Sequence, residues 1–185
     1  MSSSVNTTMP FVGSSANVAT AVGLVASGML SGGILSSSVI AGPALFLAAS
    51  TNEPNLLARQ WETVYTRGRN VAIPLGTLAS SSFLYTAYAH YAAESPRGMW
   101  EKYAVAGALC IAIVPFTLTV MKANVRALQR AAKGVSETAE GEKGKERELS
   151  VDGQVSEVVR WIRLNFVRAL FPLTGFGIAV WLSLQ

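Results

Sequence analysis

The chain has 185 residues, of which half are hydrophobic and only 14% are charged, and its net charge is +4. A soluble domain has about 25% charged residues, so this composition excludes an ordinary soluble domain and is typical of a membrane protein. The positive charge does not indicate nucleic-acid binding, because the basic residues lie between apolar segments and not on one soluble face.

The first predicted membrane span lies within residues 18–47. Residues 18–50 include no charged residue and no histidine, and about 20 apolar residues suffice to cross a bilayer. Gly28 and Gly32 have a small-xxx-small spacing, which predicts close helix packing. Pro43 follows a glycine and predicts a kink or the end of the helix. The preceding residues lack the positive charge of a signal peptide, so we expect a retained span.

Three further spans are predicted at about 71–91, 103–121 and 166–184. Pro115 and Pro172 lie within the last two, where neighbouring helices can satisfy the freed carbonyl groups. Residues 131–156 are charged, contain glycine and lack an apolar stripe, which predicts a mobile cytosolic loop. A helical pattern resumes at Val155 and continues into the fourth span.

We therefore expect an all-α integral membrane bundle of four transmembrane helices, forming a single domain over residues 1–185. Of the 15 Lys and Arg residues, all but Arg97 and Lys102 lie in the segments that join the first span to the second and the third to the fourth, or at the helix ends that flank them. This bias predicts that both segments are cytosolic and that both termini are non-cytosolic. Six aromatic residues are then expected at the non-cytosolic interface: Tyr85, Tyr88, Tyr91, Trp100, Tyr103 and Trp181.

The residue types that metal sites need are scarce. The chain has one His and one Cys, and the predicted spans contain no carboxylate, so we expect no metal site. No dinucleotide-binding or P-loop motif occurs, and we expect no nucleotide cofactor. Cys110 lies in an apolar run and is predicted to be a core residue.

Six residues that could line a pocket lie at the predicted cytosolic ends of the spans: Trp61, Tyr65, Asn124, Trp161, Asn165 and Arg168. Helical spacings of four and seven place the last three on one helix face, and the first two share a face likewise. Because the topology brings these ends to one membrane surface, they are expected to form one site.

Four of these residues also have a simpler interpretation. Arg168 either serves the pocket or extends its charged group to the interface. Trp61 and Trp161 either contact a ligand or anchor the protein at the membrane surface. Asn124 either lines the pocket or caps the end of a helix.

His90 is a candidate catalytic base, because an imidazole exchanges protons near neutral pH. Residues 71–90 of one helix cover roughly 28 Å at 1.5 Å per residue. We therefore expect His90 to lie near the membrane face opposite to Arg168, which argues against a place in the same site.

Several motifs together resemble the fungal anthrone oxygenases, over roughly residues 20–184. They are Gln60-Trp61-Glu62-Thr63-Val64-Tyr65 with Gly68, then Ile113-Val114-Pro115-Phe116-Thr117 leading to Met121, then Asn124-x-x-x-Leu128, and finally Trp161-x-x-Leu164-Asn165-x-x-Arg168. The resemblance implies a monooxygenase that converts an anthrone to an anthraquinone with molecular oxygen, in the biosynthesis of an aromatic polyketide secondary metabolite. It also implies that neither a metal nor an organic cofactor is needed.

This chemistry suggests roles for the candidate residues. Arg168, Asn165 and Asn124 are expected to donate hydrogen bonds to the developing oxyanion. Trp61, Tyr65 and Trp161 are expected to flank the flat rings of the substrate. The base is unidentified. Two other interpretations remain open: a non-catalytic membrane scaffold that recruits enzymes of the pathway, or a small transport component.

Overall fold

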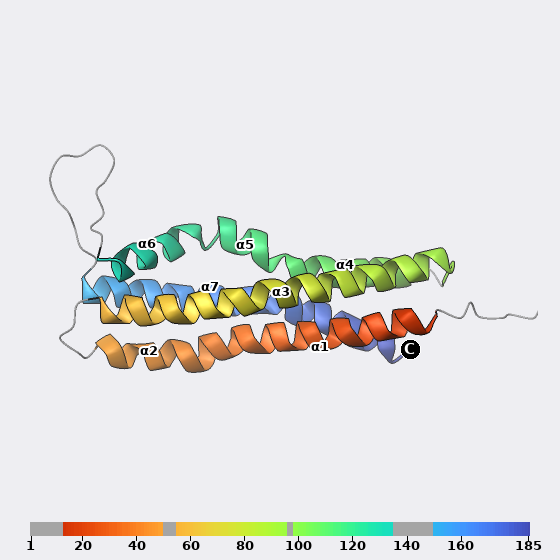
Figure 1. The fold of residues 1–185 in the computed structure, drawn as a ribbon, viewed down its shortest axis with the longest axis horizontal. Coiled ribbons are helices and arrows are strands. Elements are labelled where there is room, and N and C mark those ends of the chain that lie inside the picture. The colour runs from red at the N-terminus through yellow and green to blue at the C-terminus, as the bar shows by residue number, and fades with distance from the viewer. Residues whose placement is uncertain (1–12, 50–54, 96–97, 135–149) are drawn as a thin grey trace, which may run out of the picture.

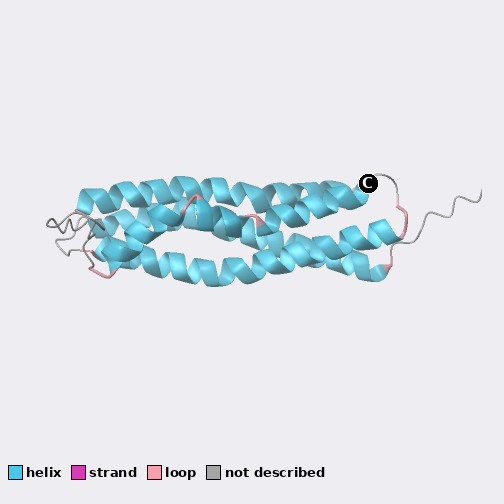
Figure 2. Ribbon diagram, turned by 90° about the horizontal axis from the view of Figure 1, so that it is seen from above, coloured by secondary structure: helices cyan, strands magenta, loops and turns pink. Residues whose placement is uncertain are grey.

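The computed structural model describes residues 13–49, 55–95, 98–134 and 150–185, and every regular element in these ranges is a helix. In chain order the elements are α1 (Ser14–Ser36), the π-helix η1 (Ser37–Ala41), α2 (Gly42–Ala49), α3 (Leu56–Ala92), α4 (Met99–Ile111), α5 (Ile113–Thr119), α6 (Lys122–Ala132) and α7 (Val151–Ser183). They run alongside one another as an elongated bundle (Figure 1), and the view from above shows the same arrangement (Figure 2). The predicted all-α class is confirmed.

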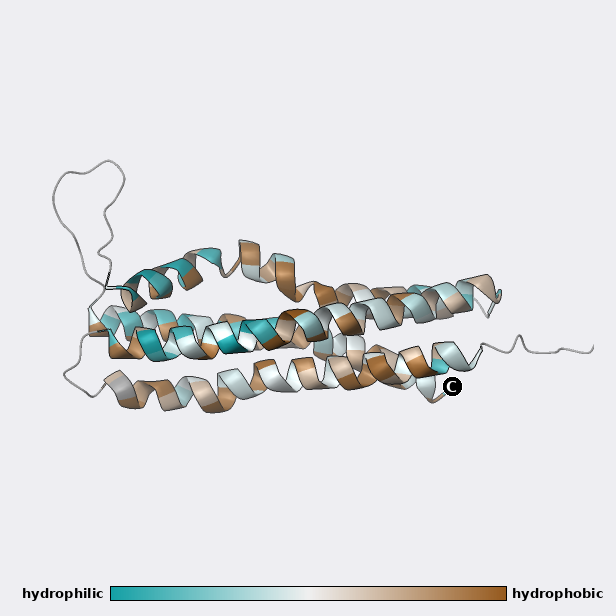
Figure 3. Cartoon of the chain, in the orientation of Figure 1, coloured by the Kyte–Doolittle hydropathy of each residue, from teal (hydrophilic) through white to brown (hydrophobic). Residues whose placement is uncertain are grey.

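Three helical segments of the described chain are long and apolar enough to cross a membrane: Ser14–Leu47, Met99–Thr119 and Val151–Ser183. They coincide with the first, third and fourth predicted spans. Helix α3 is not among them. Its first part carries Arg59, Glu62, Arg67 and Arg69, and its uncharged part from Val71 onward has a lower mean hydropathy because it is rich in Ser, Thr and Tyr. Polar residues gather at the end of the bundle that holds α6 and the starts of α3 and α7 (Figure 3).

The first span does not end at the Gly-Pro pair. Its irregular part comes earlier, as the five-residue π-helix Ser37–Ala41, and an α-helix resumes at Gly42. Pro43 has no N–H to donate to the preceding turn, which removes one helical hydrogen bond and favours a wider local turn. The helix therefore adjusts before the proline and continues.

The third span is interrupted twice. Helix α4 ends at Ile111, and α5 begins at Ile113. Pro115 cannot donate a hydrogen bond to the carbonyl of Ile111, which accounts for the first break. A second break at Val120 and Met121 separates α5 from α6.

Helix α7 begins earlier than predicted. Ser150 caps it, since its hydroxyl accepts a hydrogen bond from the Gly153 N–H at 3.3 Å. The helix then runs without interruption past Pro172 to Ser183. The predicted loop 131–156 is therefore too long at both ends, because α6 extends to Ala132 and α7 starts at Val151. Its middle part, 135–149, lies outside the described residues.

Two different cores stabilise the two ends of the bundle. At the polar end the buried cluster consists of large side chains: Leu45, Leu57, Trp61, Tyr65, Met121, Val125, Leu128, Val158 and Trp161. Toward the other end, small residues predominate in the cluster Ala26, Ala79, Phe83, Ala87, Tyr103, Ala106, Cys110, Ala179 and Leu182. A Cβ on Gly175 would lie 2.8 Å from the carbonyl oxygen of Ala106, so α4 and α7 are in backbone contact. Such close packing of small residues is typical of helices in lipid. Cys110 is buried here, as predicted.

Of the two glycines in the small-xxx-small pair of the first span, only Gly28 packs against another helix. A Cβ on Gly28 would lie 3.5 Å from the Phe176 ring, whereas one on Gly32 would meet no atom within 4 Å. Among the six aromatic residues predicted for the interface, Tyr103 is buried, and the other five are exposed.

Candidate functional site

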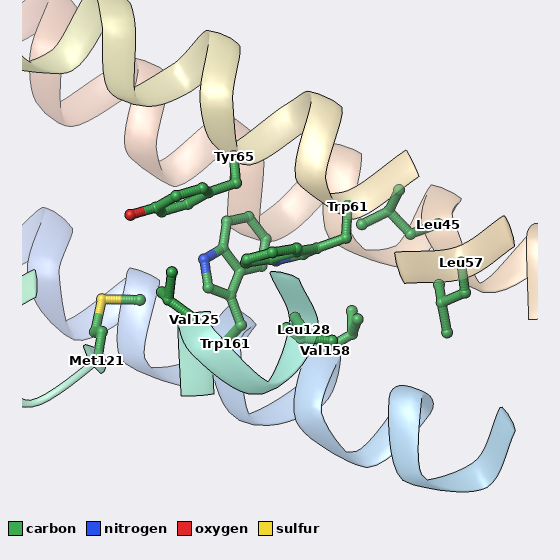
Figure 4. Packing of buried hydrophobic residues seen from close by; sticks show 9 residues of the cluster. All are labelled: Leu45, Leu57, Trp61, Tyr65, Met121, Val125, Leu128, Val158 and Trp161. Atoms are coloured by element: carbon green, nitrogen blue, oxygen red, sulfur yellow. The ribbon is translucent and has the colours of Figure 1, made fainter. Parts of the chain in front are cut away.

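Three aromatic rings form the core of the polar end of the bundle. Trp61 and Tyr65, one turn apart on α3, stack with centroids 5.1 Å apart and planes at 10°. Trp61 also meets Trp161 of α7 edge to face, with centroids 6.0 Å apart. Figure 4 shows the three rings together between α3, α6 and α7. The indoles are 0% and 1% exposed, so the interpretation of Trp61 and Trp161 as interfacial anchors is wrong.

Arg168 is held inside the bundle beside these rings. Its side chain is 8% exposed, and Nη1 donates a hydrogen bond to Oγ1 of Thr117 at 3.0 Å. The Thr117 hydroxyl in turn donates to the carbonyl of Ile113 at 2.7 Å, which fixes its orientation. The Nε atom of Arg168 is buried and has no hydrogen-bond partner among the described residues. The guanidinium group therefore does not extend to the surface.

The two asparagines join neighbouring helices. Asn165 Nδ2 donates to the carbonyl of Ile34 at 3.2 Å and to Oγ of Ser38 at 3.0 Å. Asn124 Nδ2 donates to the backbone carbonyl of Glu157 at 2.8 Å and to its Oε2 at 2.6 Å. Asn124 is the third residue of α6, so the interpretation of this residue as a helix C-cap is wrong.

Five of the six predicted pocket residues have a buried polar atom without a hydrogen-bond partner in the described structure. These atoms are Trp61 Nε1, Asn124 Oδ1, Trp161 Nε1, Asn165 Oδ1 and Arg168 Nε. Buried polar groups are nearly always paired, and leaving one unpaired costs about 1–3 kcal/mol. The cluster therefore leaves three donors and two acceptors unpaired in an otherwise apolar core, and small-molecule sites likewise place a few polar groups among apolar side chains.

A pocket opens beside this cluster, between α1, α3 and α7. The cavity is narrow, with a volume of about 90 Å³, whereas small-molecule sites are typically about 300–1,000 Å³. Four of the predicted residues line it: Tyr65, Trp161, Asn165 and Arg168. Trp61 lies behind Tyr65 and Trp161 in the core, and Asn124 is turned toward Glu157.

His90 lies in a different cavity. Its ring stacks on Tyr103 with centroids 5.3 Å apart, and Nδ1 lies 3.1 Å from Oγ of Ser95. Asn17 and Thr20 line the same cavity, which shares no lining residue with the pocket of Arg168. The prediction that His90 is separate from Arg168 is confirmed.

Three residues of this region were not among the predicted site residues. Thr117 accepts the hydrogen bond of Arg168, Glu157 accepts those of Asn124, and Ser38 accepts one from Asn165. Each contact joins two helices, and spacing along one helix carries no information about it. Thr117 does lie within one of the motifs that resemble the anthrone oxygenases, and this motif is the one feature of the sequence that could have indicated its role.

Comparison with known proteins decides the family. The family model described as anthrone oxygenase matches residues 61–178. The chain belongs to the anthrone oxygenase family. The matched region includes every predicted site residue and excludes α1, η1 and α2, which supply Ile34 and Ser38.

Curated relatives come from fungi. The chain is 33% identical over 129 residues to a noranthrone monooxygenase of Aspergillus flavus, covering 70% of this chain and 57% of that protein. It is 35% identical over 132 residues to the anthrone oxygenase ptaC of Pestalotiopsis fici, covering 69% of this chain and 85% of that protein. The chain thus spans less than two thirds of the first relative and most of the second. No solved structure matches.

Proposed function

We propose that this protein is an oxygenase that converts an anthrone to an anthraquinone with molecular oxygen, in the biosynthesis of an aromatic polyketide. Membership of the family and the names of the relatives support the reaction class. The observation that carries the proposal is the group of unpaired polar atoms around Arg168, beside the rings of Tyr65 and Trp161. A scaffold would not require such a group.

The reaction begins with loss of a proton from the central methylene of the anthrone, which gives a delocalised anion. This anion transfers electrons to oxygen. One oxygen atom becomes the new carbonyl, and the other leaves as water with the two methylene hydrogens. We assign no residue as the base that takes the first proton, since His90 belongs to the other cavity.

The residues of the pocket would act on the anion. Arg168 is placed to stabilise the oxyanion that forms at the existing carbonyl, because fixed donors are most effective in a water-poor site. The Nδ2 group of Asn165 already donates to Ile34 and Ser38, so the expected donor role of Asn165 is replaced: its unpaired Oδ1 would accept a hydrogen bond from a substrate hydroxyl. Tyr65 and Trp161 would hold the flat rings. Asn124 would act indirectly, because its hydrogen bond to Glu157 holds α6 against α7. Metal and organic cofactors have no role in this proposal, which rests on the scarcity of ligands and the lack of nucleotide-binding motifs in the sequence.

We further propose that α3 is a fourth span, over about 71–91, and that both termini are non-cytosolic. The distribution of Lys and Arg supports this topology. The pocket of Arg168 then lies near the cytosolic surface of the bilayer, where enzymes of the pathway can deliver a lipophilic substrate.

The test compares membranes that contain the protein with membranes that lack it, each incubated with an anthrone under air and under argon. We expect anthraquinone above the background of spontaneous oxidation only with the protein and air. Activity should persist after thorough chelation of metals. Turnover that disappears on chelation and returns with one specific metal would contradict the cofactor-free mechanism, and a rate equal to background would contradict the function.

A further inference from the structure

The pocket of Arg168 opens sideways, between α1 and α3. Its outer part includes Met29, which is 61% exposed, and Val71, which is 59% exposed. Its inner part includes Asn165 and Arg168 of α7, whose unpaired Oδ1 and Nε atoms are buried. The pocket therefore leads from the outer surface of the bundle to the polar cluster.

Two glycines lie at this opening, Gly33 on α1 and Gly68 on α3. A Cβ added to either would meet no atom within 4 Å. Close packing therefore does not explain them, in contrast to Gly175, where a Cβ would lie 2.8 Å from a backbone oxygen. Glycine destabilises a helix interior relative to alanine, and at these two positions it leaves the rim of the pocket without a side chain.

We propose that the substrate reaches Arg168 laterally from the bilayer, through a portal between α1 and α3 that Gly33 and Gly68 keep open. This inference rests on the proposed function for the nature of the ligand. The portal has an apolar side, with Met29 and Val71, and a polar side, with Arg69. A flat phenolic molecule, which is apolar with a polar edge, collects at the same boundary between hydrocarbon and headgroups.

A second cavity offers an alternative route from water. Tyr65, Thr117, Lys122 and Arg126 line it, and Tyr65 lines both cavities. The hydrogen bond from Arg168 to Thr117 joins the two regions. Access from this side would require the Tyr65 ring or that hydrogen bond to move, whereas the opening between α1 and α3 leads to Asn165 and Arg168 along the lining of one pocket.

The experiment uses the full chain in lipid vesicles and narrows the portal by Gly33→Leu, Gly68→Leu and both together. Matched controls are Gly32→Leu and Gly177→Leu, since a Cβ there also meets no atom within 4 Å and neither residue lines the pocket. Leu118→Trp narrows the second cavity instead. Association of a hydroxyanthraquinone is followed by quenching of tryptophan fluorescence, and anthrone oxidation is measured in parallel.

We expect the double variant to slow association by about tenfold or more and to lower kcat/KM in proportion, with little change in kcat. The glycine controls and Leu118→Trp should match the unmodified protein. Normal association in the double variant, equal slowing in the controls, or slowing by Leu118→Trp alone would overturn the portal. If the unmodified protein binds the anthraquinone through the portal but oxidises no anthrone, the proposed function fails and the portal stands.

Discussion

Asn165 on α7 donates a hydrogen bond to the hydroxyl of Ser38, 3.0 Å away in the π-helix of the first span. The same Nδ2 group donates to the carbonyl of Ile34 at 3.2 Å. These contacts hold the amide so that its Oδ1, which has no partner among the described residues, remains beside the pocket. The irregular turn of the first span therefore positions a residue of the site.

Replacing Ser38 with alanine should lower both thermal stability and anthrone oxidation. The variant leaves one donor of Asn165 without its second acceptor, and a hydrogen bond of this kind contributes about 0.5–1.5 kcal/mol. Ser36→Ala is the matched control, because Ser36 is exposed and lies only two positions earlier in the first span. Thermal unfolding in detergent and oxidation rates in vesicles measure the two effects. A Ser38→Ala protein equal to the control in both would show that this contact does not position Asn165.

Replacing Arg168 with leucine should abolish most anthrone oxidation while membrane insertion persists. The free energy of membrane insertion should become more favourable, by up to roughly 2–3 kcal/mol for a central position, because the variant removes a charge from the span. Activity should fall by about a hundred- to a thousandfold, as is typical for loss of one oxyanion donor. Arg163→Leu, at an exposed position of the same helix, is the control for loss of charge.

Arg168→Lys distinguishes a charge from a specific donor geometry. Lysine keeps the charge but lacks the planar set of donors of arginine, so this variant should also be weak, though less so than Arg168→Leu. Oxidation rates at equal expression measure the difference. Normal turnover by Arg168→Leu would remove this residue from the site and make His90 the first candidate.

Replacing Asn124 with aspartate should loosen the contact between α6 and α7. The new carboxylate would face the Oε2 atom of Glu157, which now accepts a hydrogen bond at 2.6 Å, and two like charges repel. The double variant Asn124→Asp with Glu157→Gln should recover part of the stability, because glutamine can donate to the aspartate. Thermal unfolding of the single and double variants gives the coupling between them. Strictly additive effects would contradict a direct interaction.

The proposed topology predicts how sealed vesicles respond to protease. In vesicles with the cytosolic side outward, protease should cut within residues 131–156 and spare a tag on the C-terminus, because the basic segments are assigned to the cytosol. Immunoblots of the tag and of the cut fragments measure the result. Loss of the tag with the 131–156 segment intact would reverse the assignment.

The helical periodicity was sufficient to predict which residues share a face. Trp161, Asn165 and Arg168 are spaced by four and three residues, and all three are buried on one side of α7. The stacked pair of Trp61 and Tyr65 on α3 follows the same rule. Such spacing depends only on the local geometry of a helix, so one segment is enough to predict it.

Contacts between helices were not predictable in this way. The hydrogen bond between Asn124 and Glu157 depends on how α6 tilts after the break at Met121. The π-helix depends on how the chain compensates for the lost N–H of Pro43, and it adjusts on the preceding turn. In both cases tertiary packing selects among several local conformations that the sequence allows.

The length of α3 has a consequence for how the protein responds to its surroundings. Its 37 residues extend about 55 Å at 1.5 Å per residue, whereas the hydrocarbon layer is about 30 Å thick. In the proposed topology, the end with Trp61 and Trp161 therefore folds against water, and the alanine-rich end folds against lipid. Urea weakens apolar burial in water, so it acts first on the tryptophan end. The ligand pocket lies at the junction and is lost with that end, while the embedded half of the bundle remains assembled.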